Sequence, residues 1–118
     1  MSLMQKQSRK NILDAADKSL HGYVIELCKS YLHVYLSDVR VWLEYARALT
    51  QLSRFDEAEE AFDHAFASST EKQHCIIFSD RGYLNRRRGN YLEAEKWYLK
   101  AIEAKPEAVW PRVFLGVV

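Results

Sequence analysis

Two stretches of this chain resemble each other at a fixed distance, and this repetition limits the fold more than any other feature. FDEAEEAFDHAF begins at Phe55 and YLEAEKWYLKAI begins at Tyr91, so the two stretches lie 36 residues apart. A constant period of about this length is typical of architectures in which similar units stack on their neighbours. The pairs that keep the spacing are Trp42 with Phe78, Ala46 with Gly82, Glu57 with Glu93, Ala58 with Ala94, Phe62 with Tyr98 and Ala65 with Ala101.

Signals for helix starts and stops divide the first period into two helices. Asp38 predicts the N-cap of a helix from Val39 to about Leu52. Ser53 predicts the cap of a second helix that runs to about Ala67.

The second period shows the same division. Thr70 and Gln73 have the spacing of a capping box and predict a helix that runs to about Arg88. Gly89 and Asn90 then supply a left-handed cap and a turn. Asn90 starts the next helix, which Pro106 closes because proline cannot continue a helix.

The first 38 residues match this pattern less well. Apolar residues at spacings of three and four predict a helix from about Leu20 to Leu36. A weaker helix is expected around Ile12 and Leu13, as its antiparallel partner. This segment is interpreted as either a divergent repeat or a capping hairpin.

Composition agrees with a helical globular protein. The chain has 118 residues, of which 48% are apolar and 28% are charged, with only two prolines and four glycines. No apolar run approaches the ~20 residues of a membrane span. With a net charge of +1 there is no general attraction to nucleic acid, and the two cysteines fit a reduced, cytoplasmic protein.

The repeated residues resemble the tetratricopeptide repeat family, whose unit is a two-helix hairpin of about 34 residues. The resemblance spans residues 39–118 and implies an all-α, right-handed solenoid of antiparallel helix hairpins. We expect a single domain, 1–118, with a divergent repeat or cap (1–38), two full repeats (39–69 and 70–106) and a half-repeat (107–118). Trp42, Ala46, Ala58 and Phe62 carry the motif in the first full repeat, and Phe78, Gly82, Ala94, Tyr98 and Pro106 carry it in the second.

Residues 107–118 resemble the first helix of a further repeat that lacks its partner helix. Leu115-Gly116 stands where the family has its Leu-Gly pair. We therefore expect the chain to be a fragment of a longer array. If it acts by itself, Trp110, Phe114 and Val117 predict self-association through this C-terminal half-repeat.

No motif in the sequence predicts catalysis, a metal or a cofactor. His74-Cys75 is the only His–Cys neighbour pair, and adjacent helical residues point about 100° apart, which is poor geometry for joint ligands. No glycine-rich phosphate loop or catalytic triad is evident. We expect a non-catalytic protein.

The resemblance implies a concave groove lined by the first helices of the hairpins, which holds a peptide or a helix. Arginine suits carboxylates and tyrosine offers contact area, so the expected partner carries acidic and apolar side chains. The alternatives are ordinary exposed residues without a ligand, a self-assembly module, and an RNA-binding repeat that uses Arg86 to Arg88. The residues predicted to line the groove are Arg40, Leu43, Arg47, Thr50, Ile76, Ser79, Tyr83, Arg86 and Trp110.

Overall fold

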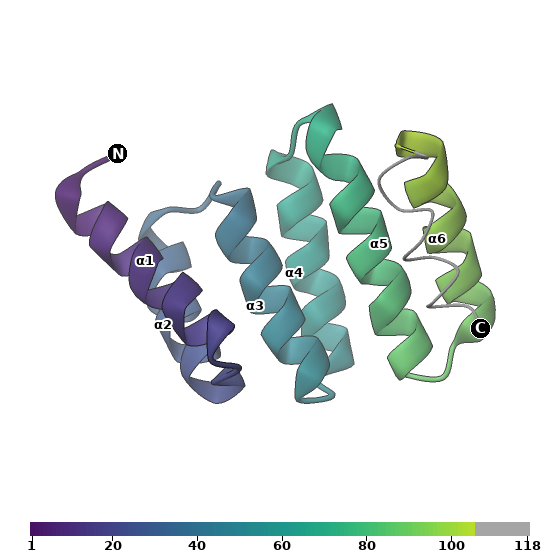
Figure 1. Ribbon diagram of the computed structural model, residues 1–118, viewed down its shortest axis with the longest axis horizontal. Coiled ribbons are helices and arrows are strands. Elements are labelled where there is room, and N and C mark those ends of the chain that lie inside the picture. Colours follow the sequence, from purple (N-terminus) through teal and green to yellow (C-terminus); the bar gives the residue numbers. More distant parts are fainter. Residues whose placement is uncertain (106–118) are drawn as a thin grey trace. The chain divides into compact units, whose positions relative to one another are not determined.

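The described part of the chain, residues 1–105 of the computed structural model, is built from helices, and Figure 1 shows them in chain order. It separates into two compact units, the first covering Met1–Ser68 and the second beginning at Ser69. The prediction of an all-α protein made of helix hairpins is confirmed. The helices are α1 (Leu3–Asp17), α2 (His21–Val34), α3 (Val39–Gln51), α4 (Phe55–Ser68), α5 (Glu71–Arg87) and α6 (Tyr91–Ala104).

Each hairpin turns through the same backbone motif. The residue after the helix cap has a positive φ in all three turns: 56° at Ser19, 61° at Ser53 and 84° at Gly89. In each turn the N–H groups of this residue and of the one after it donate to carbonyls in the last turn of the helix, for example Ser53 N to Thr50 O at 3.0 Å and Arg54 N to Leu49 O at 2.9 Å. This pair of bonds is the Schellman motif, which satisfies carbonyls that a helix end would leave without partners.

The predicted role of Ser53 as an N-cap is therefore wrong. Ser53 ends α3 in the left-handed region, and α4 begins two residues later at Phe55. A serine before an apolar run has the pattern of an N-cap, but here the two-residue turn needs the backbone conformation rather than the hydroxyl.

The other predicted helix starts have mixed outcomes. Asp38 caps α3 as predicted, with its Oδ1 accepting from Val41 N at 3.4 Å. At α5, Thr70 N donates to Gln73 Oε1 at 2.9 Å, which is the reciprocal bond of a capping box. Asn90 does occupy the N-cap position of α6, but its side chain makes no capping bond. Pro106 lies outside the described residues.

The first unit contains two hairpins, α1–α2 and α3–α4, with α3 in contact with all three other helices. Small residues make the close approach between α3 and α4, because Ala46 and Ala58 are both fully buried. Phe62 and Trp42 fill the surrounding space. The N-terminal segment thus folds as a helix hairpin, and its turn residue Ser19 stands 34 residues before Ser53.

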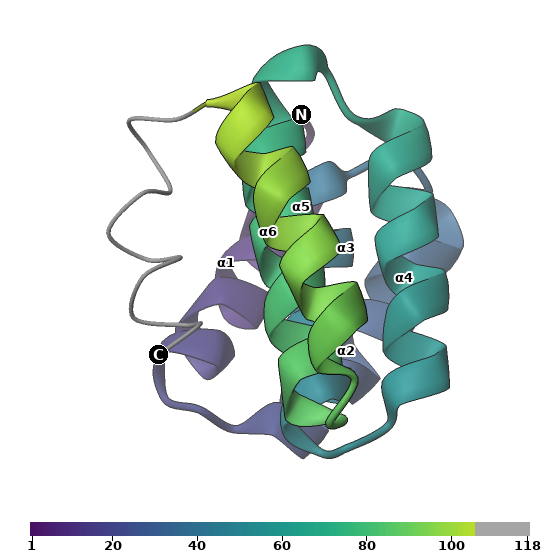
Figure 2. The ribbon, with the colours of Figure 1, turned by 90° about the vertical axis from the view of Figure 1, so that its right-hand side faces the viewer.

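The second unit consists, in its described part, of α5 and α6, which run antiparallel and pack against each other; Figure 2 views this pair with α6 in front of α5. Gly82 is the contact point between them. A Cβ added there would lie 2.7 Å from Cδ1 of Tyr98, so the ring occupies the space that any larger residue would need. Cys75 and Ala101 form a second buried contact, against which Phe78 and Ile102 pack.

Candidate interaction surface

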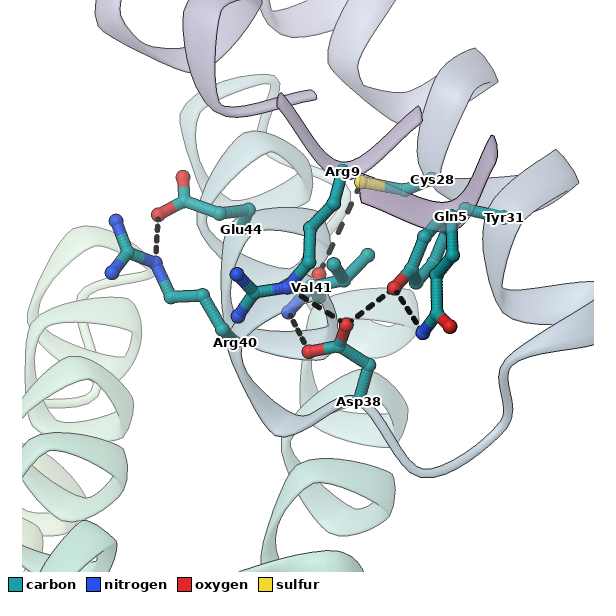
Figure 3. Close-up of polar contacts among 8 residues, drawn as sticks. All are labelled: Gln5, Arg9, Cys28, Tyr31, Asp38, Arg40, Val41 and Glu44. Atoms are coloured by element: carbon teal, nitrogen blue, oxygen red, sulfur yellow. Dashed lines mark hydrogen bonds and ion pairs between the residues drawn. The ribbon is translucent and has the colours of Figure 1, made fainter. Parts of the chain in front are cut away.

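The first-unit residues predicted for the groove centre on a charged group along α3. Glu44 lies between two arginines, accepting from Arg40 Nε at 3.2 Å and from Arg47 Nη1 at 3.0 Å. Spacings of three and four residues place all three side chains on one face of the helix. The Glu44 side chain is only 10% exposed, whereas that of Arg40 is 54% exposed. Figure 3 shows the ion pair of Arg40 with Glu44.

Glu44 was not among the predicted site residues, yet it orients both arginines. A carboxylate held this close fixes the planes of the guanidinium groups and reduces the local charge from two positive units to one. The i, i+4 and i, i+3 spacings are visible in the sequence and could have revealed this arrangement.

Two α3 residues predicted to face outward are buried. Leu43 is 3% exposed and Thr50 is 2% exposed. Thr50 donates its hydroxyl to Ala46 O at 2.8 Å, as buried threonines in helices often do.

In the second unit the predicted residues divide in a similar way. Ile76 and Tyr83 are exposed on α5, one above the other at a spacing of seven residues. Arg86 lies beside them, with its Cζ 5.7 Å from the centre of the Tyr83 ring, within the range of a cation–π contact. Ser79, predicted to face outward, is buried. Trp110 lies outside the described residues.

A hydrogen-bonded network around Asp38 joins the helices that support this surface (Figure 3). Asp38 Oδ2 accepts from Arg9 Nε of α1 at 2.9 Å and from Tyr31 Oη of α2 at 2.6 Å. Gln5 Nε2 donates to Tyr31 Oη at 3.0 Å. Asp38 therefore ties two earlier helices to the start of α3.

Burial and charge disfavour ionisation in this region. The pKa of Tyr31 is raised above its ordinary value of 10.0, first by burial and then by the bond that its hydroxyl donates to Asp38. Burial, followed by the negative charges of Glu44 and Asp38, raises the pKa of the Cys28 thiol to about 12. A thiol held protonated in this way is a packing residue and a poor nucleophile.

Arg81 stands 36 residues after Tyr45, and the change from an aromatic to a cationic side chain has a local explanation. Its Cζ lies 4.6 Å from the centre of the Trp97 ring, and Lys100 Nζ lies 4.5 Å from the same ring. Phe78 contacts Trp97 with the ring centres 5.8 Å apart. Arg81 thus packs as a cation on an aromatic surface instead of as an aliphatic side chain.

Residues 1–105 lack the features of a metal site or a membrane span. No group of three or more His, Cys, Asp or Glu side chains could hold a metal ion there. His74 contacts the ring of Phe78, and its neighbour Cys75 is buried against Ala101. None of the helices in this part is long and apolar enough to cross a membrane.

Comparison with known families gives two matches. Two family models, each described as a tetratricopeptide repeat, match residues 26–71 and 78–107. Together they cover well over half of the chain. The first match begins within α2, upstream of residue 39, where the resemblance seen in the sequence begins. A comparison with curated proteins gives no match.

Proposed function

Because this chain belongs to the tetratricopeptide repeat family, we propose that it is a non-catalytic scaffold or adaptor that binds a protein partner. Repeats of this family are generally modules for protein–protein interaction. The finer proposal concerns the chemistry of the partner. It is made for each compact unit by itself.

The arginine pair of α3 is the observation that carries this proposal. Arg40 and Arg47 converge on one carboxylate, so their planar donor groups are held in a fixed arrangement before any ligand arrives. A guanidinium matches the two oxygens of a carboxylate, which makes an acidic side chain the natural ligand of the exposed Arg40. Arg47, on the same face, extends the cationic surface by about two helical turns.

The second unit, taken by itself, offers an apolar contact surface. Ile76 and Tyr83 are exposed on one face of α5, and the Arg86 guanidinium lies over the tyrosine ring. Tyrosine offers a large rigid surface at low entropic cost. We infer that the partner is an extended peptide or a helix with acidic and apolar side chains, bound with about micromolar affinity. A cytoplasmic location stays a prediction.

A displayed library of random peptides would test this proposal. We expect selection on the native chain to enrich peptides with acidic and apolar residues. The double variant Arg40→Glu/Arg47→Glu should bind the selected peptides at least about tenfold more weakly, because the charge of the surface is reversed. Tyr83→Ala should reduce the preference for apolar side chains.

Lys29→Glu is a control for charge reversal elsewhere, since it reverses one exposed charge on α2 and should leave binding unchanged. Circular dichroism would establish that each variant remains folded. Enrichment of basic peptides, or equal affinity of the native chain and the double variant, would contradict the proposed surface.

A further inference from the structure

The face of α6 that points away from α5 carries two exposed leucines. Leu92 is 75% exposed and Leu99 is 53% exposed, and they stand seven residues apart with Glu95 and Lys96 between them. These four residues share one face of the helix because their spacings are three, four and seven. The buried residues of α6, namely Ala94, Tyr98 and Ala101, lie on the opposite face.

The corresponding face of α4 shows that a hairpin of this kind does not require these leucines. Thirty-six residues earlier, the same places carry four acidic residues, and the ones aligned with the leucines are exposed. Leucine at both places therefore adds apolar surface that the hairpin itself does not use. The acidic residues are Asp56, Glu59, Glu60 and Asp63.

The order of Glu95 and Lys96 along α6 makes this face complementary in charge to an antiparallel copy of itself. If two α6 helices lie antiparallel around a two-fold axis between residues 95 and 96, Leu92 of one copy faces Leu99 of the other. In the same register Glu95 faces Lys96 of the second copy, and symmetry forms each contact twice. A parallel arrangement in register would instead place Glu95 against Glu95, which is repulsive.

We propose that this chain pairs with a second copy through an antiparallel contact between the two α6 helices, centred on Leu92, Glu95, Lys96 and Leu99. The ion pair of Lys96 with Glu93 does not oppose this contact, since it is 3.4 Å long and Lys96 is 69% exposed. The contact is small, so the dimer is weak and forms at high concentration. The proposal is independent of the peptide-binding surface, which lies on other helices.

Analytical ultracentrifugation of the whole chain from about 10 μM to about 1 mM covers the range expected for a small interface. The native chain should show a mass that rises with concentration toward the dimer. Leu92→Glu and Leu99→Glu should each weaken association at least about tenfold, because a charge replaces the central apolar contact. Leu36→Glu, which changes an equally exposed leucine of the first unit, should leave association unchanged.

A charge exchange tests the register independently of the leucines. Glu95→Lys and Lys96→Glu should each weaken self-association, because each puts like charges opposite one another. The double variant Glu95→Lys/Lys96→Glu should restore it. An equimolar mixture of the two single variants should form a heterodimer, because one contributes two lysines and the other two glutamates.

Three results would overturn the proposal. The first is a monomeric mass over the whole concentration range. The second is a dimer that persists in Leu92→Glu but is lost in Phe114→Glu, which would assign the association to residues 106–118. The third is a double charge variant that associates as poorly as the single variants, which would exclude the antiparallel register.

Discussion

At the scale of single residues, Gly82 shows most directly how one position sets the spacing of two helices. A Cβ there would approach both Cδ1 and Cε1 of Tyr98 to 2.7 Å, closer than side chains tolerate without a shift of ring or backbone. Gly82→Ala should therefore lower the free energy of unfolding by about 1–3 kcal/mol, although alanine is the better helix former. Urea denaturation would measure the change.

Gly22 provides the control for this prediction. It also lies within a helix, α2, but nothing stands within 4 Å of a Cβ built on it. Gly22→Ala should raise the free energy of unfolding by about 0.5–1 kcal/mol, because only helix propensity changes. If both substitutions stabilise the chain, the close contact of α5 with α6 does not require glycine at position 82.

Cys28 predicts how stability depends on alkaline pH. The pKa of its thiol is about 12 in the folded chain against 9.0 ordinarily, so the unfolded state loses the proton first as pH rises. Stability from this group is complete below pH 9.0 and is lost between pH 9.0 and about 12. By pH 10 the loss should be about 1 kcal/mol.

Urea denaturation at pH 8 and pH 10 would measure this loss. Cys28→Ala should be less stable at both pH values because it leaves a cavity, but its stability should fall less between them. Tyr31 and Tyr45 contribute in the same direction, since burial raises both of their pKa values above 10.0. An equal fall in the native chain and in Cys28→Ala would show that the tyrosines account for the whole effect.

At the scale of helices and turns, the three Schellman motifs make a comparison possible. Ser53 pays a steric cost that glycine would avoid at φ 61°, whereas Gly89 sits at φ 84° with open space around its Cβ position. Ser53→Gly should raise the free energy of unfolding by about 0.5 kcal/mol, and Gly89→Ala should lower it by about 1 kcal/mol. Thermal unfolding of both variants would test this. A loss of stability in Ser53→Gly, or a gain in Gly89→Ala, would contradict the shared turn geometry.

These turns also show what the sequence can and cannot predict about the helices. Gly89 was recognisable as a left-handed cap because glycine favours that conformation, but Ser53 and Ser19 were not, since serine rarely adopts it. The cap at Asp38 was predictable because its partner Val41 is three residues away. Its bonds to Arg9 and Tyr31 were not, because those residues come from other helices.

The sequence likewise predicts only part of the candidate surface. Arg40, Ile76 and Tyr83 were correctly expected to be exposed, because helical periodicity separates them from the apolar stripe. Leu43 and Thr50 were expected to be exposed in the same way, but both are buried. A repeat motif describes one hairpin, so it does not show how much of a helix its neighbours will cover.

At the scale of the whole molecule, the distribution of charge favours a protein partner over a nucleic acid. The chain carries a net charge of +1, and two of its arginines, Arg40 and Arg47, bind the same carboxylate of Glu44. The cluster Arg86 to Arg88 stands at the last turn of α5, where positive charge stabilises the helix end. Binding to phosphate backbones needs several basic contacts along one surface.

We therefore expect a fluorescent single-stranded RNA to show no saturable binding in polarisation measurements at about 150 mM salt. Weak binding at low salt should disappear steeply as salt rises, and Arg87→Glu should change it no more than Lys29→Glu does. Each substitution alters the total charge equally, so a purely electrostatic attraction cannot distinguish them. Saturable binding that only Arg87→Glu removes would instead make the C-terminal turn of α5 an RNA site.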